Sequence, residues 1–423
     1  MKKNKENKEV QEVKQKRRKQ GKENEDISKG IEIAKKALQK EKKQKQKEKE
    51  IEKKEKERKK STNNILKYIL IIVSIIIIVL LFKYRHIIGI TISKEISEQD
   101  AIVIDIATSD NKVYAYQNEI LVYSKGTLTT YSRYGKKTWE YTFDETFIPE
   151  INTNGKYIQV VNKDSGYIYV FDNKYESCRK KIDGTIKKSS INEKGQSVIH
   201  YSKEGIKSDI GIFDKKGKQK YEVTLKTENI ASAMLSENGR YLLIYEVETQ
   251  GISVNSILKI IDFRNSQEVK KVLEVENDII YDIEFTNSKI IALTSNKVYT
   301  CNISSDSKRE LNITDKNISN ISLDKSGIAY VYKEISDEES TIQFLNGRYS
   351  IIGTHKFNES IKYFTYYNSL AYVVQNKEIN IYNRWGMHIK KYVSDSIITN
   401  PVVFNDGKNM AIIYSNKIVV IGI

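Results

Sequence analysis

Proline, cysteine and tryptophan each occur only twice in the 423 residues of this chain. The two cysteines, Cys178 and Cys301, lie 123 positions apart, which excludes the closely spaced framework of a small disulfide-stapled domain. We expect two unpaired, half-buried thiols. No cysteine follows an apolar N-terminal stretch, so a lipid-modified cysteine is not expected to be the membrane anchor.

Histidine is almost as scarce, and its four copies are scattered at His86, His200, His355 and His388. None has a second ligand at the helical or hairpin spacing of a metal site, so we expect surface or rim positions for them. The chain also lacks a glycine-rich phosphate loop, a zinc-protease helix motif and a nucleophile elbow. The sequence therefore assigns no catalytic, cofactor-binding or metal-binding residue, and we predict a protein that is not an enzyme.

The basic charge of the chain is concentrated at its N-terminus. Residues 1–60 carry 25 Lys and Arg against 13 Asp and Glu, whereas the sequence from 83 onward is nearly neutral. The segment 1–61 is too poor in apolar residues to form a packed core, so we expect a mostly disordered, solvated tail. A nucleic-acid-binding arm is the alternative, but interleaved glutamates and the lack of aromatic residues favour contact with anionic lipid headgroups.

A single long apolar run, residues 65–82, follows this tail. Eighteen helical residues rise about 27 Å, close to the thickness of a bilayer core, so we predict one transmembrane helix within 62–84. Residues 41–60 contain eleven Lys and Arg, and far fewer follow the run. The positive-inside rule then places the N-terminus in the cytoplasm and residues 83–423 outside, with 85–99 as a connector.

From residue 100 the pattern changes to short apolar strands separated by polar turns, which recur about every 40 residues. Such a period of strands is typical of four-stranded propeller blades. The turns are Asn118-Glu119, Asn154-Gly155, Lys194-Gly195, Asn238-Gly239, Asn287-Ser288, Ser326-Gly327, Asn368-Ser369 and Asp406-Gly407.

A second hairpin follows each of these turns by about 20 residues, with glycines such as Gly135, Gly217 and Gly386 suited to a tight turn. The last copy stops after three strands, and a spare strand at 101–107 precedes the first copy. Pairing the two would close a ring and remove both free edges. We therefore predict an all-β fold over 100–423, a β-propeller with eight blades favoured and seven as the alternative; a pair of β-sandwiches is a further possibility.

Units such as Ile168-Tyr169-Val170-Phe171-Asp172-Asn173 resemble blades of the quinoprotein-alcohol-dehydrogenase-like propeller superfamily. The whole layout is similar to a family of uncharacterised membrane-anchored clostridial proteins. A bias toward Lys, Ile, Asn and Tyr also indicates an AT-rich bacterial genome. Quinone-dependent members of the superfamily stack their cofactor on tryptophan, but here Trp139 and Trp385 both fall in outer hairpins, so no cofactor is expected.

These observations predict a cell-membrane protein whose extracytoplasmic propeller is a non-catalytic binding or scaffold module for a protein or an envelope glycan. The 28 tyrosines fit such a contact surface, although tyrosine also fills blade faces well. Two alternatives stay open: a quinoprotein-like or hydrolytic enzyme at the propeller channel, and a transmembrane sensor that signals through the basic tail.

Overall fold

The computed structural model divides the chain into two units, Met1–Tyr84 and Arg85–Ile423. It describes residues 53–54, 67–80, 94–96, 101–106, 112–204, 206–225, 229–265, 268–313, 317–324, 327–333, 339–358, 361–398, 400–414 and 416–422.

A helix occupies residues 67–80, inside the segment predicted to span a bilayer. Within the parts of the chain that the structure describes, no helix combines the length and the apolar character needed to cross a membrane. Residues 65–66 and 81–82 lie outside the described residues, as does the predicted tail apart from 53–54. The transmembrane helix, the tail and the topology therefore stay predictions.

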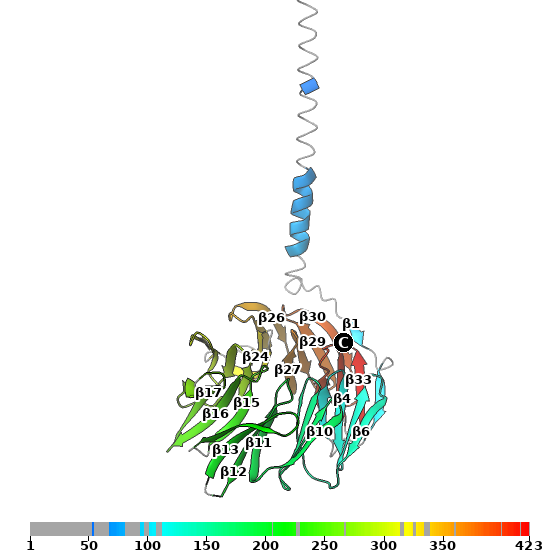
Figure 1. The fold of residues 1–423 in the computed structure, drawn as a ribbon. Helices are drawn as coiled ribbons and strands as arrows, with labels where there is room; N and C mark the ends of the chain where they lie inside the picture. The colour runs from blue at the N-terminus through cyan, green and yellow to red at the C-terminus, as the bar shows by residue number, and fades with distance from the viewer. Residues whose placement is uncertain are drawn as a thin grey trace, which may run out of the picture. The chain divides into compact units, whose positions relative to one another are not determined.

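The second unit is an eight-bladed β-propeller, in which each blade contains four antiparallel strands A, B, C and D, consecutive in the chain in every blade but the eighth (Figure 1). Blade 1 contains β3 (Lys112–Tyr116), β4 (Glu119–Ser124), β5 (Thr127–Ser132) and β6 (Lys137–Thr142). Blade 2 contains β7 (Glu150–Asn154), β8 (Tyr157–Asn162), β9 (Tyr167–Asp172) and β10 (Tyr175–Lys181). Blade 3 contains β11 (Thr185–Ile191), β12 (Ser197–Lys203), β13 (Ile206–Phe213) and β14 (Gln219–Leu225). Blade 4 contains β15 (Ile230–Leu235), β16 (Tyr241–Gln250), β17 (Ser253–Asp262) and β18 (Val269–Val275).

The remaining blades repeat this order and confirm eight as the blade count. Blade 5 contains β19 (Asp282–Phe285), β20 (Lys289–Leu293), β21 (Lys297–Asn302) and β22 (Lys308–Asn312). Blade 6 contains β23 (Asn317–Asp324), β24 (Gly327–Lys333), β25 (Ser340–Leu345) and β26 (Ile351–Phe357). Blade 7 contains β27 (Tyr363–Tyr367), β28 (Leu370–Val374), β29 (Glu378–Asn383) and β30 (His388–Val393). Blade 8 contains β31 (Asn400–Val403), β32 (Asn409–Ile413), β33 (Lys417–Gly422) and β2 (Ile102–Asp105).

The closing strand predicted from the sequence is confirmed. β2 supplies the outer strand of blade 8 and pairs antiparallel with β33, from Ile102 opposite Val420 to Asp105 opposite Lys417. One strand was not foreseen: β1 (Lys94–Ile96), within the predicted connector 85–99, pairs parallel with β30 and gives blade 7 a fifth strand. Residues 94–96 of the predicted connector therefore pair with the propeller, and the rest of 85–99 lies outside the described residues.

The core is a ring of apolar layers, one between each pair of neighbouring blades. Side chains alternate between the two faces of a strand, so a blade contributes to both of its neighbours. In β9, Tyr169 and Phe171 pack in the layer shared with blade 1, whereas Ile168 packs in the layer shared with blade 3. This two-sided burial explains why the middle strands B and C, such as β8 and β9, are buried almost throughout.

The antiparallel order gives the propeller two distinct ends. The connections between strands A and B and between C and D leave from one end, which we call the turn end. The connections between B and C and between successive blades leave from the other, which we call the loop end. At the turn end the predicted glycines have positive φ, 74° at Gly135 and 77° at Gly217 and Gly386. A Cβ on Gly386 would lie 2.2 Å from the carbonyl oxygen of Thr354 in blade 6, so these turns also pack neighbouring blades together.

Candidate functional site

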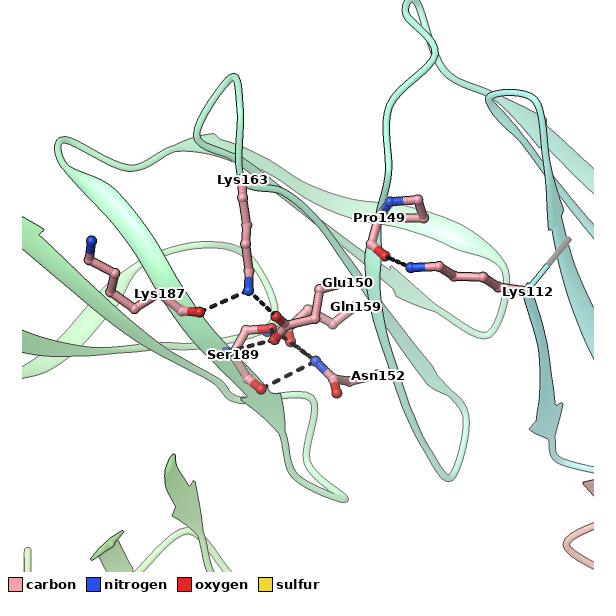
Figure 2. Close-up of polar contacts among 8 residues, drawn as sticks. All are labelled: Lys112, Pro149, Glu150, Asn152, Gln159, Lys163, Lys187 and Ser189. Carbon is pink, nitrogen blue, oxygen red and sulfur yellow. Dashed lines mark hydrogen bonds and ion pairs between the residues drawn. The ribbon is translucent and has the colours of Figure 1, made fainter. Parts of the chain in front are cut away.

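A polar network joins the inner strands of blades 2 and 3 at the loop end, with Glu150 at its centre (Figure 2). Glu150 is the first residue of β7. Its Oε1 accepts hydrogen bonds from the Ser189 amide at 2.8 Å and from the Ser189 hydroxyl at 2.5 Å. Its Oε2 lies 2.6 Å from Nζ of Lys163, which also donates to the carbonyl of Lys187 at 2.8 Å.

Two amide side chains extend the network toward the blade interior. Asn152 donates through Nδ2 to Oε1 of Gln159 and to the hydroxyl of Ser189, both at 2.9 Å. Gln159 is fully buried and donates to the carbonyl of Ser190 at 3.2 Å. On the other side Lys112 of blade 1 donates to the carbonyl of Pro149 at 2.7 Å. Three consecutive blades are thus linked through polar groups close to one carboxylate.

The hydrogen bonds of this network indicate a structural role. Burial alone would raise the pKa of Glu150, but hydrogen bonds from Lys163 and Ser189 outweigh it and hold that pKa below its ordinary value. The carboxylate is therefore ionised at neutral pH, and both of its oxygens already accept hydrogen bonds. The hydroxyl of Ser189 is engaged by Glu150 and Asn152, and no histidine contacts it in the described network. Such an arrangement braces the blades and is a poor acid, base or nucleophile.

Two of the exposed apolar side chains at the loop end lie around blades 4 and 5; Ile148 and Ile397 are exposed on other connections of the same end. Ile252 is fully exposed at the tip of the β16–β17 hairpin, and Tyr281 is 67% exposed on the connection to blade 5. β16 and β17 have ten residues each, about three more than β12, so the hairpin extends roughly 10 Å farther. The amide of Asn277 donates to Oδ1 of Asn255 at 3.1 Å, which ties the blade connection to the hairpin.

An acidic hollow of about 560 Å³ adjoins these apolar residues. Three carboxylates and one ammonium group face it, and its lining is Glu274, Val275, Glu276, Asn277, Asp278, Asn296, Lys297 and Tyr299. Asp278 accepts hydrogen bonds from the hydroxyl of Ser295 at 2.9 and 3.0 Å, so its charge points into the region between blades 4 and 5. This patch of Ile252, Tyr281 and the acidic hollow, which we call the blade 4–5 patch, is the surface on which an apolar and a basic group could bind side by side.

The two ends of the propeller also differ in charge. Among described residues, the loop end carries nine acidic side chains (Asp144, Glu145, Asp164, Asp183, Glu204, Glu276, Asp278, Glu339 and Asp395) and four basic ones (Lys125, Lys163, Lys362 and Lys377). The described turn end carries thirteen basic side chains (Arg133, Lys136, Lys156, Lys174, Lys194, Lys215, Lys216, Lys218, Arg240, Arg264, Arg348, Arg384 and Lys408) and six acidic ones (Glu193, Asp214, Glu237, Glu268, Asp306 and Asp406). The near-neutral composition therefore conceals a strong separation of charge.

The residues considered from the sequence do not gather into one site. His86 lies outside the described residues. His200, expected at the surface, is instead buried, with Nε2 3.2 Å from the hydroxyl of Ser208, and burial lowers its pKa. The rings of His355 and His388 flank Tyr382 at 4.3 and 5.0 Å. Among the described residues, no group of three or more His, Cys, Asp or Glu side chains could hold a metal ion.

The cysteines and tryptophans are equally dispersed. Cys178 and Cys301 are free, as expected, but both are fully buried rather than half-buried. Trp139 lies on β6 and packs edge-on against Phe171 at 5.4 Å. Trp385 lies in the turn between β29 and β30 and is 49% exposed. The sequence analysis did not predict the network around Glu150 or the blade 4–5 patch. The signal in the sequence for the patch is the unusual length of the β16–β17 hairpin.

A comparison with models of known protein families assigns this chain to one of them. A family model described as "Family of unknown function (DUF5711)" matches residues 92–423, a range that includes β1. No curated protein matches the chain. Among solved structures, the chain is similar to the β-propeller domain of Cps50 (Swd1) from Myceliophteria thermophila at 12% identity and a TM-score of 0.41, covering 64% of this chain and 94% of that one. It is also similar to the dihydro-heme d1 dehydrogenase NirN in complex with DHE at 8% identity and a TM-score of 0.46, covering 76% and 75%. At these values neither structure bears on the activity of this chain.

Proposed function

The chain belongs to the family of unknown function DUF5711, and from that premise we propose that it is a membrane-anchored, non-catalytic binding protein whose propeller faces outside the cytoplasm. The apolar run 65–82 anchors it, and the excess of Lys and Arg before that run orients it. The propeller is the rigid support, and its loop end is the surface that meets the partner.

The blade 4–5 patch is the observation that carries this proposal. Ile252 stands at the tip of a projecting hairpin, where a partner could bury its whole side chain on binding. Tyr281 adds a broad, rigid contact at low entropic cost. The acidic hollow beside them would receive a lysine or arginine of the partner. This combination favours a protein partner over an envelope glycan, because glycans carry few large aliphatic groups to cover Ile252.

Photo-crosslinking in the native cell tests the binding surface. Benzoylphenylalanine in place of Ile252 or Tyr281 should give a discrete adduct of one additional protein. The matched control is Ile351, which is 59% exposed on the outer strand of blade 6 and should give none. Adducts from Ile351 as strong as those from Ile252, or none from either patch position, would refute the assignment.

The orientation has a separate test. A reporter that is active only outside the cytoplasm, fused after Ile423, should be active, and one that is active only in the cytoplasm should be silent. The opposite pattern would overturn the topology. A sensor role would in addition require a partner for residues 1–60 inside the cell, and no observation on the propeller favours it.

An enzyme at the channel is the competing function. Among the described residues, both oxygens of Glu150 already accept hydrogen bonds and Trp139 packs against Phe171, so neither of these two side chains is available to hold a quinone. We expect no rise in the melting temperature of the purified chain with added quinone and calcium, since a ligand that binds only the folded state must stabilise it. A rise of several degrees that disappears in Trp139→Ala or Trp385→Ala would establish the enzyme instead.

A further inference from the structure

The turn end of the propeller has three features that the binding role proposed for the loop end does not use: a strong positive charge, exposed aromatic rings and the start of the folded chain. We propose that this end docks onto the anionic headgroups of the bilayer in which the chain is anchored. The inference rests on the proposed membrane anchorage. It adds a second interaction surface, opposite to the blade 4–5 patch.

The positive charge of the turn end is available for an external anion. Six of its basic side chains are exposed and form no ion pair among the described residues, namely Lys136, Lys216, Lys218, Arg264, Arg348 and Lys408. The acidic groups of the same end are partly neutralised, since Asp214 pairs with Lys220 and Asp306 pairs with Lys270. Clustered Lys and Arg side chains near a membrane are attracted to anionic lipid headgroups.

Two turns of the same form flank the closing blade. Arg133-Tyr134-Gly135 lies in blade 1 and Arg384-Trp385-Gly386 lies in blade 7. In each, the guanidinium lies over the neighbouring ring, 4.8 Å from the Tyr134 centroid and 5.2 Å from the Trp385 centroid. Both rings are about half exposed or more. An aromatic ring with a cation beside it is the combination found at the level of lipid headgroups, where one part of the group stays wet.

The chain also enters the propeller at this end. β1 is parallel to β30, which begins directly after the turn 384–387, and Lys94 pairs with Lys390. The first described strand of the propeller therefore starts toward the turn end, beside the C-terminus (Figure 1). Only eleven residues, 83–93, separate Lys94 from the apolar run, and a chain of that length spans at most about 40 Å. Because the first described strand starts toward the basic end and so few residues precede it, the bilayer is favoured over a soluble anion as the partner.

The test uses the full chain reconstituted in vesicles, with Trp139→Phe so that Trp385 is the sole tryptophan. Vesicles carry brominated lipids, which quench an adjacent indole, and contain either only phosphatidylcholine or phosphatidylcholine with phosphatidylglycerol. We expect strong quenching of Trp385 in the anionic vesicles, weak quenching in the neutral ones, and reversal at high salt. Trp385→Phe, which retains only the packed Trp139, supplies the background.

A matched pair of charge reversals then locates the surface. Lys136→Glu with Lys408→Glu acts at the turn end, and Lys125→Glu with Lys362→Glu makes the same change in net charge at the loop end. At about fivefold per lysine removed, and with further repulsion from each added glutamate, the first pair should lower the ratio of docked to undocked propeller by at least about 25-fold, and the second should leave it unchanged. Equal effects of the two pairs, or equal quenching in neutral and anionic vesicles, would overturn the docking proposal.

Flotation of the same vesicles in 1 M salt separates this outcome from failure of the anchorage. A chain that floats in 1 M salt but shows no quenching of Trp385 in anionic vesicles at low salt is anchored but undocked, which refutes the inference alone. A chain that fails to float refutes the proposed anchorage and the inference with it. Far-ultraviolet circular dichroism of each charge-reversed chain confirms that the propeller is folded.

Discussion

Replacement of Glu150 by glutamine probes the brace between blades 2 and 3 with almost no change in shape. Glutamine keeps one carbonyl oxygen, which can still accept from Ser189. Its amide group, however, would present a donor to Nζ of Lys163, which is also a donor and now lies 2.6 Å from the carboxylate. The variant therefore loses the charge-assisted bond to Lys163 and weakens the two bonds from Ser189.

The size of the loss follows from the charge and the burial. A hydrogen bond to a charged group contributes about 1.5–3 kcal/mol, and the Glu150 side chain is 24% exposed, which places it toward the lower half of that range. We expect Glu150→Gln to lower the free energy of unfolding by about 2 kcal/mol. Glu378→Gln is the control, because the 30% exposed carboxylate of Glu378 pairs with Lys391 at 2.8 Å without the additional serine hydrogen bonds of Glu150, and its loss should cost less than about 1 kcal/mol.

The pH dependence has a defined sign. The pKa of Glu150 is lower in the folded chain than in the unfolded one, where it is about 4.3. Its contribution to stability is therefore complete above about pH 5 and is lost as the pH falls through the folded-state pKa. The difference between the parent chain and Glu150→Gln should be constant from pH 5 to 8 and should shrink at lower pH.

Urea unfolding of the detergent-solubilised full chain, followed by circular dichroism at several pH values, measures this difference. Amide hydrogen exchange of the segment around Ser189 reports the local effect, since its amide donates directly to Glu150. The reasoning fails if Glu150→Gln costs no more than Glu378→Gln. It also fails if the cost of Glu150→Gln is the same at pH 3 as at pH 7.

Two further predictions concern closure and turns. Deletion of 101–106 should lower the melting temperature far more than deletion of 1–52, because it removes the outer strand of blade 8 and exposes the layer around Ile104; equal melting temperatures, measured by calorimetry, would contradict the closing role of β2. Gly386→Ala should destabilise by more than about 2 kcal/mol, because a Cβ would meet backbone at 2.2 Å in a positive-φ turn. Gly251→Ala is the matched control, with a φ of 61° and no atom within 4 Å, and urea midpoints that agree for the two would refute the packing argument.

The repeat and its closure could be read from the sequence because both depend on local chemistry. A hairpin turn such as the one at Gly135 is specified by a few adjacent residues, and alternation of apolar side chains is visible strand by strand. The number of these turns therefore gave the number of blades. The extra strand at 101–107 supplied the fourth strand that the last copy lacks after Ile421. β1 was not predicted, because Lys94-Glu95-Ile96 is too short to show an alternation of apolar and polar residues.

The surfaces and sites depended on which ends of the strands meet in space. Glu150, Lys163 and Ser189 are far apart in sequence and come together only because neighbouring blades pack face to face. His200 carries a polar side chain, yet its strand position buries it. The sequence from residue 83 onward is nearly neutral. Its basic and acidic ends become visible only when each connection is assigned to one end of its blade. Local sequence determined the strands and turns, whereas the tertiary structure decided the surfaces, because charge and exposure are properties of the assembled ring.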